Sequence, residues 1–148
     1  MAHYTFLIEN VSSIKRMLAN SAYAAELNVT TVGNSPAFHS ARGHGLHMLA
    51  TTTAPFTRRL LKTEYGVNAS IRLLFGIHAP FAEDAKDCLL IAVNQILSDY
   101  EGNALLFTKS GDIVLWREDN KLFLNTNEDI WDDDREEFID PPFEFSPQ

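Results

Sequence analysis

The sequence is poor in cysteine and lacks a long apolar run. Its 148 residues include one cysteine, Cys88, so no disulfide can form within the chain. No stretch approaches the ~18 apolar residues that a membrane-spanning helix needs. The first ten residues show no basic segment followed by an apolar run, so they do not resemble a secretion signal. These absences predict a cytoplasmic protein that does not enter a membrane.

Basic residues are scarce near the C-terminus. Hydrophobic residues make up 45% of the chain and charged residues 22%, so length and composition predict a single globular domain over residues 1–148. Residues 1–111 contain nine Lys or Arg and eight Asp or Glu, whereas residues 112–148 contain three Lys or Arg and twelve Asp or Glu. The net charge of −8 therefore belongs to the last quarter of the chain. Such an asymmetry indicates a surface for a basic partner and argues against nucleic acid, whose phosphates would be repelled.

The N-terminal half predicts strands that alternate with helices. A β-prone run at residues 3–8 precedes Ser12 and Ser13, either of which could cap a helix that begins at Ile14. Residues 28–45 are rich in Thr, Gly, Asn, Ser and Pro, so we expect an irregular segment with a short strand near residues 29–32. The elements expected next are a strand at 46–53, a helix from Pro55 to Tyr65 and a strand at 69–79.

The longest predicted helix covers about residues 81–101. Its apolar face repeats at the 3.6-residue period and consists of Phe81, Ala85, Cys88, Leu89, Ala92, Ile96, Leu97 and Tyr100. Three β-prone runs follow at residues 105–108, 113–117 and 121–124, and the short turns between them favour hairpins. The predicted fold class is therefore α+β: a mainly antiparallel sheet with the long helix on one face and a C-terminal β-meander, with the strand order left open.

The chain ends in a predicted acidic, irregular tail at residues 126–148. Its apolar residues could attach it to the sheet; they are Ile130, Trp131, Phe138, Ile139, Phe143 and Phe145.

The C-terminal half resembles a known protein family. The residues that carry the likeness are Gly-Asn-Ala-Leu-Leu-Phe at 102–107, Gly-Asp-Ile-Val-Leu at 111–115, Lys-Leu-Phe-Leu-Asn at 121–125, Trp131, and Phe-Ile-Asp-Pro-Pro-Phe at 138–143. With the order of elements before them, they are similar to the swarming-inhibition (Sit) immunity proteins, small bacterial proteins encoded beside polymorphic toxins. The resemblance covers residues 67–145, and residues 28–44 depart from it. It implies binding and neutralisation of a cognate toxin, and it supplies no catalytic residues.

The acidic run is the candidate partner-binding site. Aromatic anchors amid charged residues suit the centre and rim of a protein interface. The residues predicted to contact the partner are Trp131, Asp132, Asp133, Asp134, Glu136 and Glu137, with Glu128 and Asp129 at the rim. A solvated charge run is the plainer reading. A calcium loop lacks the ligand spacing, and a glycosidase carboxylate pair cannot be picked from the sequence.

Histidine and cysteine offer two further chemistries. His39, His44 and His47 lie within nine residues, and zinc favours imidazole ligands. If residues 44–47 are extended, however, His44 and His47 point to opposite faces, so surface or structural histidines are the preferred interpretation. Cys88 lies on the apolar helix face with no preceding cation to lower its pKa, which favours a buried thiol over a nucleophile.

Three functional hypotheses follow. The first is an immunity protein that binds a toxin, in which an acidic surface plugs a basic active-site cleft. The second is a small metal- or carboxylate-dependent enzyme, and the third is a protein-binding module without a toxin partner. Under the first we expect no catalytic residue, metal or cofactor and no nucleic-acid or membrane partner. The toxin, its activity, whether its active site is blocked directly, and the oligomeric state stay open.

Overall fold

The sheet contains nine strands in the part of the chain that the structure describes. The structure is a computed structural model and describes residues 2–30 and 38–148. The strands are β1 (Ala2–Ile8), β2 (Asn28–Thr30), β3 (Phe38–Gly43), β4 (Leu46–Thr52), β5 (Ile71–Ile77), β6 (Ala104–Thr108), β7 (Ile113–Glu118), β8 (Lys121–Leu124) and β9 (Glu144–Phe145). The helices are α1 (Ile14–Ala24), α2 (Pro55–Tyr65), the 3-10 turn η1 (Ala79–Phe81), α3 (Ala82–Asp99) and α4 (Asp133–Glu136).

The strand order is β2-β3-β4-β5-β1-β6-β7-β8-β9. Neighbouring strands are antiparallel except β8 and β9, which are parallel. The N-terminal strand lies at the centre, where Phe6 stands opposite Leu73 of β5 and Leu106 of β6. The α+β class, the mainly antiparallel sheet and the β6–β8 meander are confirmed.

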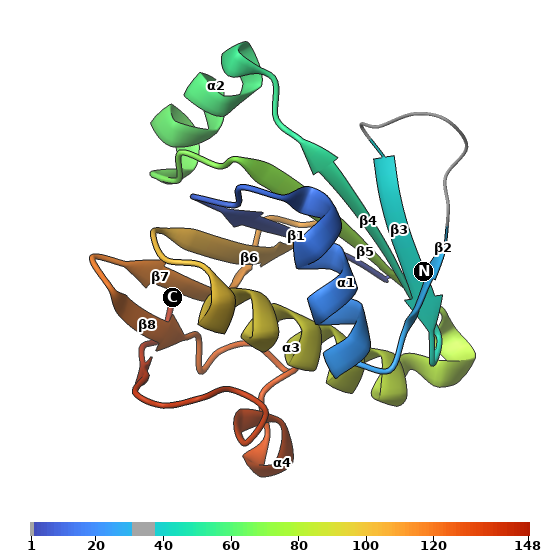
Figure 1. The fold of residues 1–148 in the computed structure, drawn as a ribbon. Coiled ribbons are helices and arrows are strands. Elements are labelled where there is room, and N and C mark those ends of the chain that lie inside the picture. Colours follow the sequence, from blue (N-terminus) through green and yellow to red (C-terminus); the bar gives the residue numbers. More distant parts are fainter. Residues whose placement is uncertain (1, 31–37) are drawn as a thin grey trace.

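One face of the sheet is covered by α1 and α3, and we call it the helical face (Figure 1). The Ser13 hydroxyl accepts a hydrogen bond from the Arg16 backbone N–H and so caps α1, one of the two predicted alternatives. The apolar face of α3 buries eight residues against the sheet. The predicted long helix is confirmed with shorter bounds, because Phe81 belongs to η1 and is 57% exposed and Tyr100 is extended.

The opposite face, which we call the open face, is covered only in part. Helix α2, all of whose residues are described, buries none of them completely. Its residues Leu61 and Tyr65 pack over a small second cluster that includes Leu7 and Leu105. The helix ends at Gly66, whose φ of 74° is the left-handed conformation that glycine adopts without strain.

The prediction of an irregular segment at residues 28–45 is wrong for its second part. Residues 38–43 form β3, which pairs with β4 along its whole length through a turn at His44 and Gly45. Both turn residues have positive φ, 52° and 80°, which suits a tight hairpin. The expected short strand near residues 29–32 corresponds to β2, and residues 31 and 32 lie outside the described part. The tail contains the single-turn helix α4 and the two-residue strand β9.

Candidate partner-binding surface

The acidic tail is attached to the start of α3 by one buried cation, Arg135. This side chain is 8% exposed. Its Nε donates to Asp87 at 2.9 Å, and its Nη2 pairs with the Glu83 carboxylate. Its Nη1 lies 3.6 Å from Asp132. Because a guanidinium presents several donors in a rigid plane, it can hold three carboxylates from two segments together.

The same contacts change the titration of Glu83. The hydrogen bond from Arg135, together with its positive charge, lowers the pKa of Glu83 below the ordinary value of 4.5. Glu83 therefore stays ionised and paired through the neutral pH range.

Other tail residues fix the backbone on both sides of this ion-pair cluster. The Asp132 carboxylate accepts a hydrogen bond from the Arg135 backbone N–H at 2.8 Å and so caps α4. The Trp131 indole donates to the Val114 carbonyl at 3.0 Å. Ile130 and Ile139 are 3% and 2% exposed and belong to the main core. The tail is therefore built into the fold, and its charged side chains are held at defined positions.

The contacts of Arg135 and a nearby hollow group carboxylates of the tail, of α3 and of Glu26, which follows α1, and we call this group the acidic surface. It comprises Glu26, Glu83, Asp84, Asp87, Asp132, Asp133, Asp134, Glu136 and Glu137. The three that bind Arg135 still reach solvent, since the side chains of Glu83, Asp87 and Asp132 are 77%, 40% and 54% exposed. A hollow of about 440 Å³ between the end of α1 and the start of α3 is lined by Glu26, Asp84 and Asp87 and extends this surface.

The structure brings together five of the eight residues predicted to bind a partner. Asp132, Asp133, Asp134, Glu136 and Glu137 lie in or beside α4, in the acidic surface. Asp129 is exposed and Glu128 is half-buried, and burial, with Asp112 and Asp129 nearby, raises the pKa of Glu128. Trp131 is half-buried and contributes to the core, so its exposed part is limited.

Sequence reasoning missed the acids of α3 and the role of Arg135. Glu83 and Asp87 are the two α3 residues whose carboxylates bind Arg135. They lie 52 and 48 residues before Arg135 in the chain, and periodicity does not reveal such pairings. The available signal was a single arginine inside an acidic run, next to residues with a strong tendency to cap a helix.

The structure separates the three candidate histidines. By strand register, His39 lies beside Ala50, while His47 pairs with Arg42 on the opposite face. His44 occupies the hairpin turn, and its Nε2 is 4.0 Å from Glu26. Among the residues that the structure describes, no group of three or more His, Cys, Asp or Glu side chains is arranged so that it could hold a metal ion.

Cys88 is 8% exposed on α3. Burial, followed by the nearby carboxylates of Asp87 and Asp84, raises the pKa of its thiol to about 11. A thiol with this pKa stays protonated at neutral pH and is a poor nucleophile. No helix within residues 2–30 and 38–148 combines the length and the hydrophobicity of a membrane span.

Fold and surface define a class: a small α+β protein with one open sheet and an anchored acidic tail. Within that class, the chain matches the SitI3-like family over residues 8–135, a range that begins well before the stretch that carries the sequence resemblance and ends before residues 136–145. The chain belongs to this family of Sit-type immunity proteins. Searches of curated proteins and of solved structures gave no match.

Proposed function

We propose that the protein is a non-enzymatic immunity protein that binds and neutralises a cognate toxin in the cytoplasm of the producing cell, using the acidic surface. The observation that carries the proposal is the family match together with nine carboxylates gathered from three segments. The cations among them are Arg135, which is buried, and Lys86, so the surface has a strongly negative field. Such a surface complements a toxin whose active-site cleft is basic.

The anchoring of the tail supports this function physically. Long charged side chains on a mobile segment lose conformational entropy when they bind, and this loss weakens association. Here Arg135, Ile130 and Ile139 fix the backbone beforehand, so the carboxylates near α4 are already positioned. A fixed negative field steers a basic partner and speeds its association.

The test is co-purification with the product of the adjacent gene, followed by calorimetry and stopped-flow kinetics at low and high salt. We expect a one-to-one complex whose association rate falls as salt is added, because salt screens exposed charges. The triple variant Asp133→Asn, Asp134→Asn, Glu137→Gln should slow association about tenfold or more at low salt. All three residues are exposed, and none of them pairs with Arg135.

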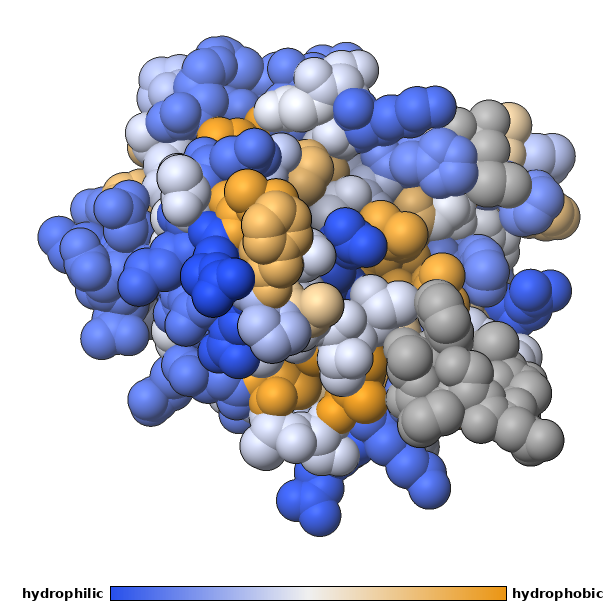
Figure 2. Space-filling model, turned by 90° about the horizontal axis from the view of Figure 1, so that it is seen from above, coloured by the Kyte–Doolittle hydropathy of each residue, from blue (hydrophilic) through white to orange (hydrophobic). Residues whose placement is uncertain are grey.

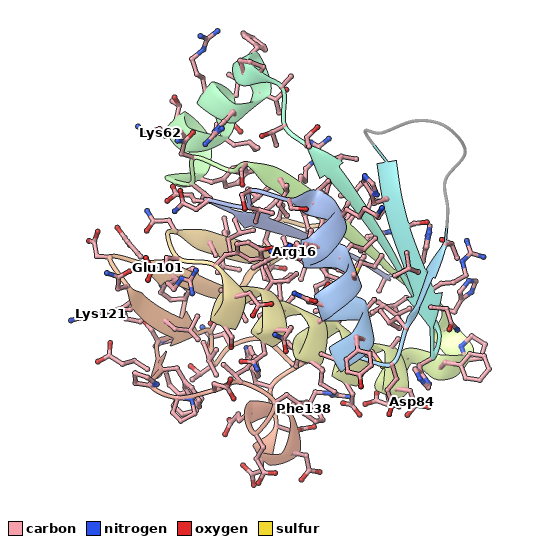
Figure 3. The ribbon with its side chains drawn as sticks, viewed as in Figure 1. Arg16, Lys62, Asp84, Glu101, Lys121 and Phe138 are labelled. Atoms are coloured by element: carbon pink, nitrogen blue, oxygen red, sulfur yellow. The ribbon has the colours of Figure 1, made fainter. Side chains whose placement is uncertain are left out.

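The matched control removes three negative charges at the opposite end of α3. Asp99→Asn, Glu101→Gln and Asp119→Asn change the net charge by the same amount, and Glu101 lies far from Asp84 (Figure 3). This control should change the association rate much less than the triple variant does. The absence of a complex, or equal effects of the two triple variants, would refute binding through the acidic surface.

A further inference from the structure

A second concave surface lies on the open face, away from the acidic surface. A hollow of about 550 Å³ separates the end of α2 from strands β6–β8, a volume within the ~300–1,000 Å³ range of ligand-binding pockets. The lining residues that matter here are Glu64, Tyr65, Trp116, Arg117, Glu118 and Phe123. None of the residues predicted from the sequence to bind a partner lines this hollow.

The floor of the hollow is aromatic and fixed. The rings of Trp116 and Phe123 stack with centroids 4.9 Å apart and an interplanar angle of 16°. At the α2 side, Tyr65 stacks on Phe107 with centroids 5.2 Å apart. Trp116 stands opposite Leu105 on one side and Phe123 on the other, so the sheet register itself sets the position of the indole. Partly exposed, immobilised aromatic faces attract cations through their quadrupoles.

The charge available in the hollow is negative. Arg117 lines it, but its guanidinium donates to the carbonyls of Gly102, Leu97 and Tyr100 at 2.7, 2.8 and 2.5 Å. These bonds cap the C-terminal end of α3, so the guanidinium donors are used within the fold. The carboxylates of Glu64 and Glu118 are both exposed.

Two lysines lie near this region, and neither lines the hollow. Lys62 is on α2, and Lys121 stands opposite Glu118 across the β7–β8 hairpin (Figure 3). Lys121 should weaken the negative field around Glu118, so its removal provides a test in the opposite direction.

We propose that the hollow binds an arginine side chain presented by a segment of a protein partner. The guanidinium lies over the ring of Trp116 and pairs with Glu118 or Glu64. A planar guanidinium suits this site better than an ammonium, because it can stack on a ring and bind a carboxylate at the same time. The proposal goes beyond the acidic surface and does not depend on the partner being a toxin.

The two tryptophans of the chain allow a direct test by ¹⁵N NMR, with the blocked amino acid Nα-acetyl-arginine amide as the probe. Trp116 lies in the hollow, whereas the Trp131 indole is bonded to Val114 on the other face. The Trp116 indole signal should shift saturably, with a dissociation constant on the order of 10 mM, while the Trp131 signal stays in place. Blocked norleucine and blocked lysine serve as apolar and ammonium comparisons, and both should bind more weakly.

Variants show which charged residues contribute to arginine binding in the hollow. Glu64→Gln with Glu118→Gln should weaken arginine binding several-fold, and Lys121→Gln should strengthen it. The matched control Asp133→Asn with Asp134→Asn removes two charges from the helical face and should change nothing at Trp116. A Trp116 signal that does not saturate, norleucine binding as tight as arginine binding, or an equal loss in the control would each overturn the proposal. None of these outcomes depends on whether a toxin binds the acidic surface.

Discussion

The same strands form both faces of the sheet, yet the helical face is covered much more completely than the open face. On the helical face, α3 buries eight residues and the tail is held by Arg135. On the open face, α2 leaves Phe56 and Leu60 65% and 46% exposed, and Leu74 of β5 is 41% exposed. Figure 2 looks down on the end that carries α2 and shows apolar side chains interspersed with hydrophilic ones. The helical face therefore holds most of the buried side chains, and the open face leaves more large apolar side chains in contact with solvent.

Chain topology explains this difference. Strands β5 and β6 flank β1 and are antiparallel to it, so they run parallel to each other. The connection between them must return along the sheet, and α3 therefore crosses its face. Strands β4 and β5 are antiparallel neighbours, so α2 begins and ends at the same end of the sheet. The amphipathic pattern of a helix does not reveal whether the helix crosses the face of the sheet, as α3 does, or begins and ends at one end of the sheet, as α2 does.

The sharpest test of the comparison is a pair of leucine truncations. Leu89→Ala on α3 removes a fully buried side chain and should lower the free energy of unfolding by about 2–5 kcal/mol. Leu74→Ala makes the same chemical change on the open face, where the side chain is 41% exposed, and should cost about 0.5 kcal/mol or less. Urea denaturation measures both. Similar losses would mean that the open face contributes to stability as much as the helical face does.

The sequence predicts most elements of this fold but fewer of its contacts. The long helix and the meander carry strong signals, since their apolar periods and turn residues agree. Strand β3 was missed because His39, Ser40 and Arg42 do not alternate clearly with apolar residues, and its hairpin turn is only His44–Gly45. The strand order could not be predicted from the sequence, because it depends on pairings between distant segments such as β1 with β5 and β6.

For the candidate site, too, the sequence predicts the local pattern but not the contacts between distant segments. The acidic run predicts a charged surface, and five of its residues do lie together around α4. Nothing in the local pattern distinguishes Arg135, which is buried, from the exposed carboxylates beside it. The aromatic hollow was missed for the same reason, because Tyr65 and Trp116 come from segments about fifty residues apart that only the fold brings together.

A smaller effect is expected from releasing the tail. Arg135→Met keeps an apolar side chain of similar length but removes charge-assisted hydrogen bonds, and it should cost about 2 kcal/mol. The cost stays moderate because the released carboxylates of Glu83, Asp87 and Asp132 are partly exposed and can be hydrated. Hydrogen exchange should show faster opening of residues 126–145, with β1 and β5 still protected. The matched control Arg59→Met, at an exposed position of α2, should change stability by less than about 0.5 kcal/mol. Uniformly faster exchange across the sheet would instead mean that Arg135 supports the whole fold.

The smallest effect is a pH dependence confined to the helical face. Arg135 lowers the pKa of Glu83 in the folded protein, so their pairing stabilises the fold above the ordinary value of 4.5 and is lost as the pH falls through the lowered value. Glu83→Gln should therefore reduce the stability lost as the pH falls below the ordinary value of 4.5, as followed by urea denaturation at each pH. In the Arg135→Met background the same substitution should have no such effect, because the group that lowers the pKa is gone. A Glu83→Gln effect of equal size in both backgrounds would mean that the pH dependence comes from general charge repulsion in the acidic surface. If the effect of Glu83→Gln disappears in the Arg135→Met background, the pH dependence comes from the Glu83–Arg135 ion pair. This ion pair is part of the contact that holds the tail against α3.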